Sequence, residues 1–401
     1  MISDNLYSLL SSPLSADELL KAFAHADKKN NNVCFDVVPN QNIMLSNRMI
    51  LETIKHHKCT VVFAVDAMPW KIIEKYKSEF ISLIPVTSIA PSTSASVWTS
   101  ILYGVTPAEH GIYGVVIYDE TLKASISLLS NTVFYLDGRE EVIADYEPIL
   151  SKSPNIFMRA REIGVRDCLS LGRLAFSSIA SLGQKLTLGS QNFVGEDYNS
   201  LLQNPLSLIQ EYKSVVCSFL TMAEGRTLVF MYLDFDSFFH ENSYDSPIVD
   251  ALWEDLFFLA HKLKNEYDAC SLFVTDHGMA QQQKQQLGSA YGMDHWYWKH
   301  SYARPGGAGR IQFFYPKKQC FDSVLHRLED QVSDSGIVLK RDDFISRYIS
   351  REGRLNGVHR LGDIIAVAMS PSFKSIMSSS VHEHGSVTLD EMLVGMGIMV
   401  A

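Results

Sequence analysis

The sequence predicts an α/β fold in which a mostly parallel central sheet is flanked by helices. Short β-branched runs at Thr60–Val65, Thr227–Leu233 and Ser271–Thr275 alternate with longer segments of helical period. The last two runs are almost continuously apolar, as expected for strands buried on both faces of a parallel sheet. The 401 residues include 46% hydrophobic and 20% charged residues. This ordinary composition excludes a disordered, collagen-like or coiled-coil chain.

Two helices can be placed between these strands. The first is expected to begin near Ser94 and to stop at Gly104, because glycine is the usual residue just past a helix C-terminus. The second is expected over Pro247–Tyr267, with proline in its first turn and apolar residues at helical spacing.

The remaining segments predict an extension and an insertion. Residues 1–57 precede the first core strand and are interpreted as an N-terminal helical extension, so that the main domain spans residues 58–401. Residues 285–360 contain glycine and aromatic clusters, and we expect them to form an inserted small subdomain or cap near the site.

Charge and composition restrict the possible partners and the compartment. The formal net charge is −10, from 35 basic and 45 acidic residues, and no dense run of Lys or Arg is present. A nucleic-acid-binding surface is therefore not expected. The start lacks the pattern of a signal peptide, and no apolar stretch approaches the roughly 18 residues of a membrane span. The six scattered cysteines fit reduced thiols. We expect a soluble cytoplasmic protein.

Acidic and histidine side chains follow the three strands. They are Asp66, then Asp236 and His240, then Asp276 and His277. Ligands bind beyond the carboxyl ends of the strands in open α/β sheets, so these side chains are expected to converge. One such aspartate would be weak evidence, because aspartate is common in turns and helix caps. Carboxylate and imidazole together suit zinc and related transition metals, so the pattern predicts a metal site.

Five sequence blocks occur in a specific order: the strand before Asp66, PSTSASVWTSILYGVTPAEHGIYG at 91–114, the D-x-x-x-H of Asp236 and His240, TDHGM at 275–279, and HGSVTLDEM at 384–392. Together they resemble the alkaline phosphatase superfamily, and most closely its type I phosphodiesterase and nucleotide pyrophosphatase branch. Each block is short, and their order and spacing make the match specific. The resemblance implies an alkaline-phosphatase-like catalytic domain over residues 58–401.

The resemblance also implies a site with two divalent metal ions and no other cofactor. Carried over residue by residue, one ion would be held by Asp236, His240 and His384. The other would be held by Asp66, Asp276, His277 and the oxygen of the nucleophile. This donor set suggests zinc, with manganese or another transition metal as alternatives.

The nucleophile is expected in the block that begins at Pro91. In the family pattern, a serine or threonine lies three residues after the proline and ten before the glycine, which is Ser94 here. Thr93 is the alternative. Ser92, Thr93 and Ser94 could each also cap the following helix. A capping role and a catalytic role are compatible, because a helix N-terminus also stabilises an anion.

The implied activity is hydrolysis of phosphodiester or related phosphoryl substrates, which are small molecules, through a covalent phosphoserine intermediate. The alternatives are a phosphonate C–P hydrolase, a phosphoryl-group transferase in a biosynthetic pathway, or an inactive binding relic. The block departs from nucleotide pyrophosphatases, because residues 91–114 contain no Asn and Val97 stands three residues after Ser94. It also departs from alkaline phosphatases proper, because no Arg lies between Arg48 and Arg139.

Two further sets of residues are candidates for substrate contacts. Trp296 and Trp298 lie in an aromatic run between metal-ligand blocks, where they form either packing or a substrate wall. Arg304 and Arg310 lie in the predicted insertion and could fold back over the site.

Overall fold

The main sheet has seven strands, most of them parallel. The computed structural model describes residues 13–26, 33–35, 41–144, 146, 153–172, 181–194, 204–282, 293–349, 355–378 and 380–399. The strand order is β10 (Gln191–Phe193), β9 (Asp167–Leu171), β11 (Thr227–Leu233), β3 (Cys59–Val65), β12 (Ala269–Thr275), β19 (Leu393–Met399) and β4 (Ser82–Thr87). Strand β19 is antiparallel to both of its neighbours, β12 and β4, and all other pairs in the sheet are parallel. The predicted fold class is confirmed.

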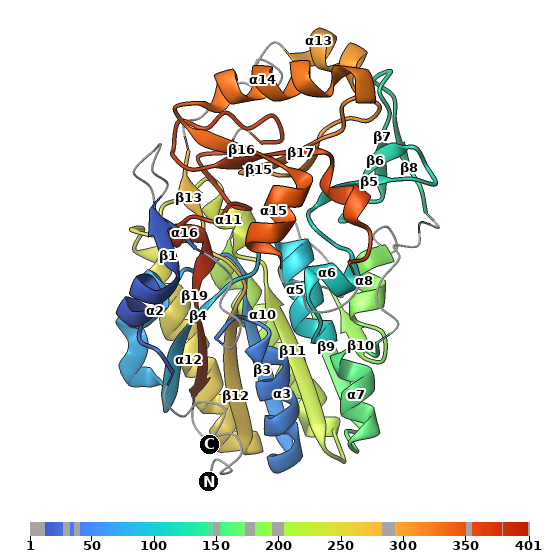
Figure 1. Cartoon of the computed structure of the whole chain (residues 1–401). Helices are drawn as coiled ribbons and strands as arrows, with labels where there is room; N and C mark the ends of the chain where they lie inside the picture. Colours follow the sequence, from blue (N-terminus) through green and yellow to red (C-terminus); the bar gives the residue numbers. More distant parts are fainter. Residues whose placement is uncertain are drawn as a thin grey trace.

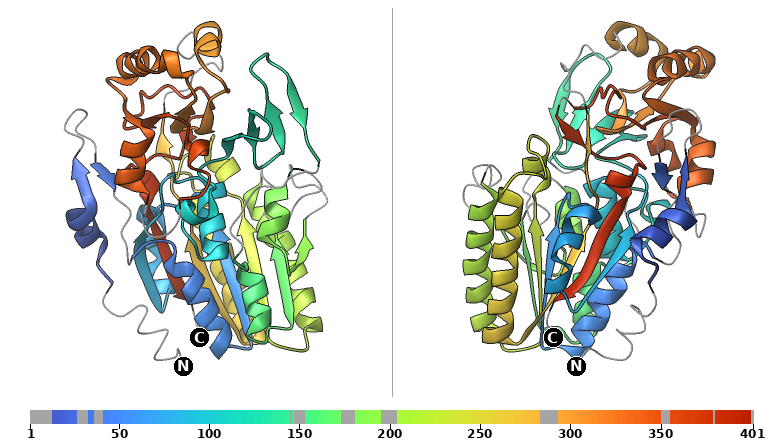
Figure 2. Two further views of the ribbon diagram at one scale, coloured as in Figure 1. Left: turned by 45° about the vertical axis from the view of Figure 1, so that its right-hand side comes forward. Right: turned by 90° about the vertical axis from the view of Figure 1, so that its left-hand side faces the viewer.

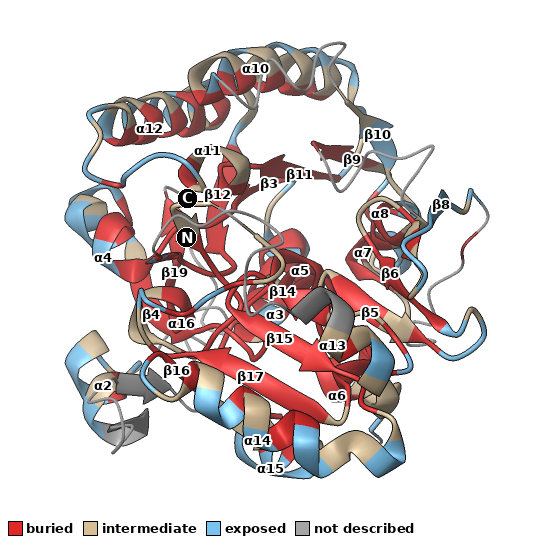
Figure 3. Ribbon diagram, turned by 90° about the horizontal axis from the view of Figure 1, so that it is seen from above, coloured by how far each residue is buried: buried red, intermediate tan, exposed pale blue. Residues whose placement is uncertain are grey.

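Helices cover both faces of this sheet (Figures 1 and 3). On one face, α10 (Pro205–Met222) packs beside α12 (Ile248–Tyr267). The other face carries α3 (Leu45–His56), α5 (Ser94–Tyr103), α7 (Ile156–Glu162) and α8 (Ser181–Leu186). Alternate residues of β3 serve the two layers, since Val61 and Phe63 join one hydrophobic cluster and Val62 and Ala64 join the other. This two-sided burial explains the continuous apolar strands.

The central strands are aligned so that they end together. Val65, the last residue of β3, pairs with Leu233 at the end of β11 and with Thr275 at the end of β12. The residues that follow these strands therefore leave the sheet at a single edge. This register, rather than proximity in the sequence, brings the predicted site residues together.

A second sheet lies over that edge (Figures 1 and 2). Its eight antiparallel strands run in the order β16 (Gly336–Lys340), β17 (Ile364–Ala368), β15 (Ile311–Phe314), β14 (Gly306–Ala308), β5 (Val116–Asp119), β6 (Ala124–Ser127), β7 (Thr132–Phe134) and β8 (Glu140–Val142). Outside it lie α13 (Met293–His300) and α14 (Phe321–Val332). We call this sheet with its helices the cap.

The cap differs from the insertion predicted at residues 285–360. Its described part does contain residues 293–349, but the sheet also needs β17 and the four strands of residues 116–142. The bridge between Gly307 and Val116 joins the two stretches. The range 285–360 therefore covers one part of the cap, and residues 116–142 and 364–368 supply its other strands.

The N-terminal residues do not form a purely helical extension. The described part of residues 1–57 contains α2 (Ala16–Phe23), the antiparallel pair β1 (Ala24–Ala26) and β2 (Val33–Phe35), and α3. Helix α3 belongs to the main domain, because Met49, Ile50 and Ile54 are fully buried in the cluster that also holds Val62 of β3. In the described part of the chain, no helix is both long and apolar enough to cross a membrane.

Candidate active site

The predicted ligands gather where the central strands end. Asp66 follows β3, and its backbone N–H donates to the carbonyl of Leu233 at 3.1 Å. Asp276 follows β12, and the N–H of Ala67 donates to its Oδ1 at 3.1 Å. Asp236 opens the short helix α11 (Asp236–Phe239) after β11. The edge of the sheet therefore brings these three carboxylates together.

The three histidines reach this edge from α11, β12 and the strand pair of β13 (Ala280–Gln281) and β18 (His382–Glu383). His240 follows α11, His277 follows Asp276, and His384 follows β18. The Nδ1 of each histidine lies against a backbone carbonyl: His240 against His382 at 2.9 Å, His277 against Gly278 at 3.1 Å, and His384 against Ser92 at 3.1 Å. A carbonyl only accepts, so Nδ1 carries a proton, and in the neutral ring Nε2 presents a lone pair. This is the usual state of metal-bound histidine.

The Nε2 atoms face the carboxylates in two groups. In the first, Nε2 of His277 lies 3.3 Å from Oδ2 of Asp276 and 3.6 Å from Oδ1 of Asp66. In the second, Asp236 lies between two histidines, with Oδ2 at 3.1 Å from Nε2 of His240 and Oδ1 at 3.4 Å from Nε2 of His384. The rings of His277 and His384 are stacked, with centroids 3.9 Å apart. The two groups are therefore adjacent.

Unpartnered buried oxygens indicate that these residues fit metal ions. Oδ1 of Asp66, Oδ1 of Asp236 and Oδ2 of Asp276 are buried and have no hydrogen-bond partner among the described residues. Each faces an imidazole nitrogen that presents a lone pair, so both sides of the contact are acceptors. Leaving such groups unsatisfied is costly, and a cation between them would satisfy both sides. Carboxylate oxygens with imidazole nitrogens match zinc and similar ions.

The pKa values of the metal-free chain also indicate that the buried carboxylates lie close to one another. Burial and the charge of Asp276 raise the pKa of Asp66 well above its ordinary value, and burial raises the pKa of Asp276 to about 7. Burial lowers the pKa of His240, but the carboxylates of Asp236 and Glu383 outweigh it and raise the pKa to about 10. Without cations, the site therefore resists holding all its carboxylates ionised beside neutral histidines.

Three consecutive hydroxyls at the start of α5 have three different roles. Oγ1 of Thr93 caps the helix by accepting from the N–H of Ser96 at 3.4 Å. The Ser92 hydroxyl donates to the carbonyl of Ser386 at 2.7 Å. The Ser94 hydroxyl instead lies 3.1 Å from Nε2 of His277. Of the three, only Ser94 is brought to the ligand group, which favours it over Thr93 as the nucleophile.

The sequence reasoning missed residues that support these ligands. The hydroxyl of Tyr232, next to the end of β11, donates to Oδ2 of Asp66, and the hydroxyl of Tyr244 donates to the carbonyl of Ala67. Ala67 itself has a positive φ of 57°, which is uncommon for a residue with a side chain. These contacts fix the turn that carries Asp66 and leave its Oδ1 directed at His277.

The two tryptophans lie in the cap. Trp296 packs against the guanidinium of Arg327, 4.4 Å from the ring centroid, and stacks on His300 at 4.2 Å. Trp298 faces Arg304, whose guanidinium carbon is 5.4 Å from its ring centroid. Both rings pack against the hydrophobic cluster of the cap. This placement favours packing over the substrate wall as their role.

The arginines of the insertion are engaged within the protein. Nε of Arg310, which is buried, lies 3.2 Å from Oε2 of Glu391, and its backbone N–H donates to the carbonyl of His384 at 2.9 Å. Oε1 of Glu391 accepts from the N–H of Ser386 at 2.9 Å. Arg310 therefore braces the loop that carries His384. In the cap, Nη1 of Arg304 lies 3.6 Å from Oε1 of Glu140.

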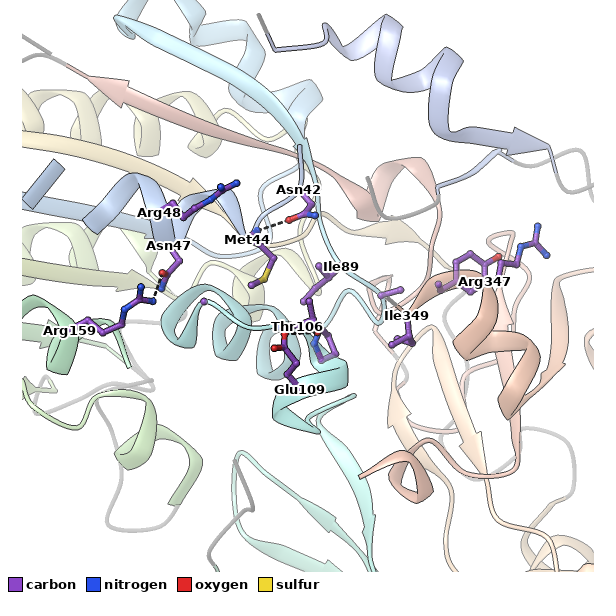
Figure 4. Close-up of a pocket in the computed structure, with 14 residues that line it drawn as sticks. Asn42, Met44, Asn47, Arg48, Ile89, Thr106, Glu109, Arg159, Arg347 and Ile349 are labelled. Carbon is purple, nitrogen blue, oxygen red and sulfur yellow. Dashed lines mark hydrogen bonds between the residues drawn. The ribbon is translucent and has the colours of Figure 1, made fainter. Parts of the chain in front are cut away.

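Two cavities are lined by residues from the segments that carry the predicted ligands. One of about 510 Å³ is lined by the loop before Ser94, by Gly104 at the far end of α5, by the start of α3 and by Arg347 and Ile349 (Figure 4). The other, of about 800 Å³, is lined by residues that include Tyr244 and His382. None of the seven predicted ligand positions lines either cavity. The ligand positions themselves are mostly buried, and the side chain of His240 is 22% exposed.

Solved structures with the same fold include murine ectonucleotide pyrophosphatase / phosphodiesterase 5, with a TM-score of 0.63 and 16% identity over 86% of this chain and 88% of that chain. The human protein of that name has a TM-score of 0.61 and 16% identity over 85% and 88%. Phosphonoacetate hydrolase from Sinorhizobium meliloti, in complex with phosphonoformate, has a TM-score of 0.57 and 16% identity over 85% and 90%. At these identities, the similarity shows the fold.

Sequence comparison gives the family. No curated protein matches the chain significantly. The model of the type I phosphodiesterase / nucleotide pyrophosphatase family matches residues 60–386, which is most of the chain and includes all seven predicted ligand positions. The chain therefore belongs to the type I phosphodiesterase / nucleotide pyrophosphatase family.

Proposed function

We propose that the chain is a metal-dependent hydrolase of phosphodiesters or related phosphoryl compounds, with Ser94 as its nucleophile. Family membership supports a phosphodiesterase, a pyrophosphatase or a phosphonate hydrolase. The observation that carries the proposal is the position of the Ser94 hydroxyl, 3.1 Å from Nε2 of His277 beside Asp66 and Asp276. A free serine is a poor nucleophile, and this position provides for its activation.

Two divalent ions would lower the pKa of the serine hydroxyl and offset negative charge on the phosphoryl group. One would be held by Asp66, Asp276, His277 and Ser94, and the other by Asp236, His240 and His384. Ser94 Oγ attacks phosphorus in line, and the bond from phosphorus to the leaving oxygen breaks. Water then cleaves the phosphoserine and regenerates the hydroxyl. Ser94 is the first residue of α5, and the N-terminus of a helix would stabilise negative charge on the phosphoryl group.

The second candidate is hydrolysis of a phosphonate C–P bond. It is favoured by the fold shared with a phosphonoacetate hydrolase and by the absence of an Asn from residues 91–114. Transfer of the phosphoryl group to an acceptor other than water would use the same serine. An inactive binding relic is disfavoured, because all seven ligand positions hold competent residues. Assaying monoesters, diesters and phosphonates with the purified protein separates the active alternatives.

Removal of metal is expected to abolish activity. EDTA should take the hydrolysis of bis-p-nitrophenyl phosphate to background, and excess Zn²⁺ or Mn²⁺ should restore it, because the unpartnered carboxylate oxygens of the site need cations. Elemental analysis of the active chain is expected to give about two ions per chain. Activity that persists in EDTA would contradict a metal-dependent mechanism.

A preference for diesters over monoesters is expected. A monoester dianion carries more charge on its free oxygens, and hydrolases of monoesters usually add an arginine to the metals. Here, Arg310 is paired with Glu391 and Arg304 lies near Glu140. Comparing kcat/KM for bis-p-nitrophenyl phosphate and p-nitrophenyl phosphate tests this. A kcat/KM that is about tenfold higher for the monoester, which corresponds to about 1.4 kcal/mol of activation free energy, would contradict this prediction.

A further inference from the structure

We propose that Glu383 is a positioning residue that orients two of the metal ligands, His240 and His384. Glu383 lies in β18, immediately before His384, and its side chain is buried, with 4% of the residue exposed. The inference rests on the metal site of the proposed function, and it assigns to that site a carboxylate that is not among the seven expected ligands.

Glu383 lies behind the imidazole of His240. Its Oε1 is 3.4 Å from Nδ1, the nitrogen that also lies 2.9 Å from the carbonyl of His382. Asp236 lies on the other edge of the ring, with its Oδ2 3.1 Å from Nε2. Because Nδ1 and Nε2 are on opposite edges, Glu383 acts on the protonated nitrogen and Asp236 faces the metal-binding one. A carboxylate behind a metal-bound histidine fixes the ring and strengthens the ligand.

The second oxygen of Glu383 contacts His384. Oε2 accepts from the backbone N–H of His384 at 3.2 Å. The carbonyl of the same residue accepts from the N–H of Arg310 at 2.9 Å, so the backbone of His384 is held on both sides. One carboxylate therefore ties together two ligands that come from α11 and from β18. Both belong to the metal group that also contains Asp236.

The backbone at Gly309 lies close to the carboxylate of Glu383. A Cβ atom added to Gly309 would lie 2.1 Å from Oε2 and 2.2 Å from Cδ of Glu383. In the β13–β18 pair, Glu383 lies opposite Ala280. The absence of a side chain at Gly309 therefore gives the carboxylate its place, which offers a way to displace it without removing its charge.

Replacing Glu383 with glutamine tests the inference through metal affinity. Glutamine keeps the size but not the charge, and loss of a carboxylate behind a ligand weakens metal binding by about 10- to 100-fold. Zn²⁺ content is measured by elemental analysis after equilibration with a graded series of chelator concentrations. Glu383→Gln is expected to retain about one ion per chain at a concentration where the wild type retains two. Glu241→Gln, an exposed change beside His240, is the matched control and should behave as the wild type.

Gly309→Ala is the second variant, because it displaces the carboxylate while leaving its charge in place. It is expected to lose the same ion as Glu383→Gln. Retention of both ions with wild-type affinity in both variants would overturn the inference. So would equal weakening of both ions together with a lower Tm of the metal-stripped chain, which indicates a general structural role. A metal-loaded structure with a Glu383 oxygen about 2.2 Å from an ion would make it a ligand instead. A wild-type chain that holds no ion would overturn the proposed function itself.

Discussion

Replacing Ser94 with alanine is expected to lower kcat by roughly 10⁴- to 10⁶-fold, the range for removal of single members of a serine-based catalytic group. The hydroxyl that lies 3.1 Å from Nε2 of His277 is lost, and no neighbouring hydroxyl replaces it, because those of Ser92 and Thr93 are engaged elsewhere. The metal content should stay close to that of the wild type, because six protein ligands remain. Steady-state kinetics and elemental analysis on the same preparation measure both effects.

Thr93→Ala is the matched control for this experiment. It removes the N-cap of α5, which costs about 1 kcal/mol of stability, and it is expected to leave kcat within a few fold of the wild type. The opposite ranking, with Thr93→Ala inactive and Ser94→Ala nearly normal, would make Thr93 the nucleophile. A phosphorylated peptide recovered from an acid-quenched reaction would identify the residue directly.

The convergence of the residues that follow the central strands was predictable because parallel strands align their ends, whereas His384 and Ser94 were expected only from the family resemblance. Runs as apolar as Thr227–Leu233 and Ser271–Thr275 are typical of strands buried on both faces, and Asp236 and Asp276 follow them closely. The choice between Thr93 and Ser94 was not predictable in the same way. Both are small hydroxyl residues at a helix start, and only the direction of each side chain assigns one to the cap and the other to the site.

The cap and Glu383 were less accessible to sequence reasoning for a physical reason. Strands such as Thr132–Phe134 have three residues, too few to establish an alternating pattern, and their place depends on the distant pairing of Val116 with Gly307. A glutamate next to a histidine usually faces solvent. Glu383 is buried because Gly309, which is far away in the sequence, leaves space for it.

Asp276→Asn is expected to lower kcat/KM by roughly 10³-fold, because it removes a charged ligand from the group that contains Ser94, and a metal ion in such a site contributes several kcal/mol. The same change should have opposite effects on stability with and without metal. With saturating Zn²⁺, the wild type is expected to have the higher Tm, since ions that bind only the folded chain stabilise it by about 4 kcal/mol at 1,000 times Kd.

In EDTA at pH 8, Asp276→Asn is expected to have the higher Tm. Burial raises the pKa of Asp276 to about 7 in the metal-free fold, and its charge helps to raise the pKa of Asp66. Between pH 4 and 7, Asp276 is therefore protonated more often in the folded wild type than in the unfolded chain, so its contribution to the unfolding free energy falls as the pH rises. Asparagine does not titrate, keeps an oxygen for the N–H of Ala67 and removes one of the crowded charges. The advantage of the variant should thus shrink as the pH falls toward 5, where Asp276 of the wild type is protonated.

Calorimetry at pH 5 and pH 8, with EDTA and with Zn²⁺, measures all four conditions. A variant that is less stable than the wild type in EDTA at pH 8 would show that the Asp276 carboxylate stabilises the fold on its own and that the crowded charges are not what the metal relieves.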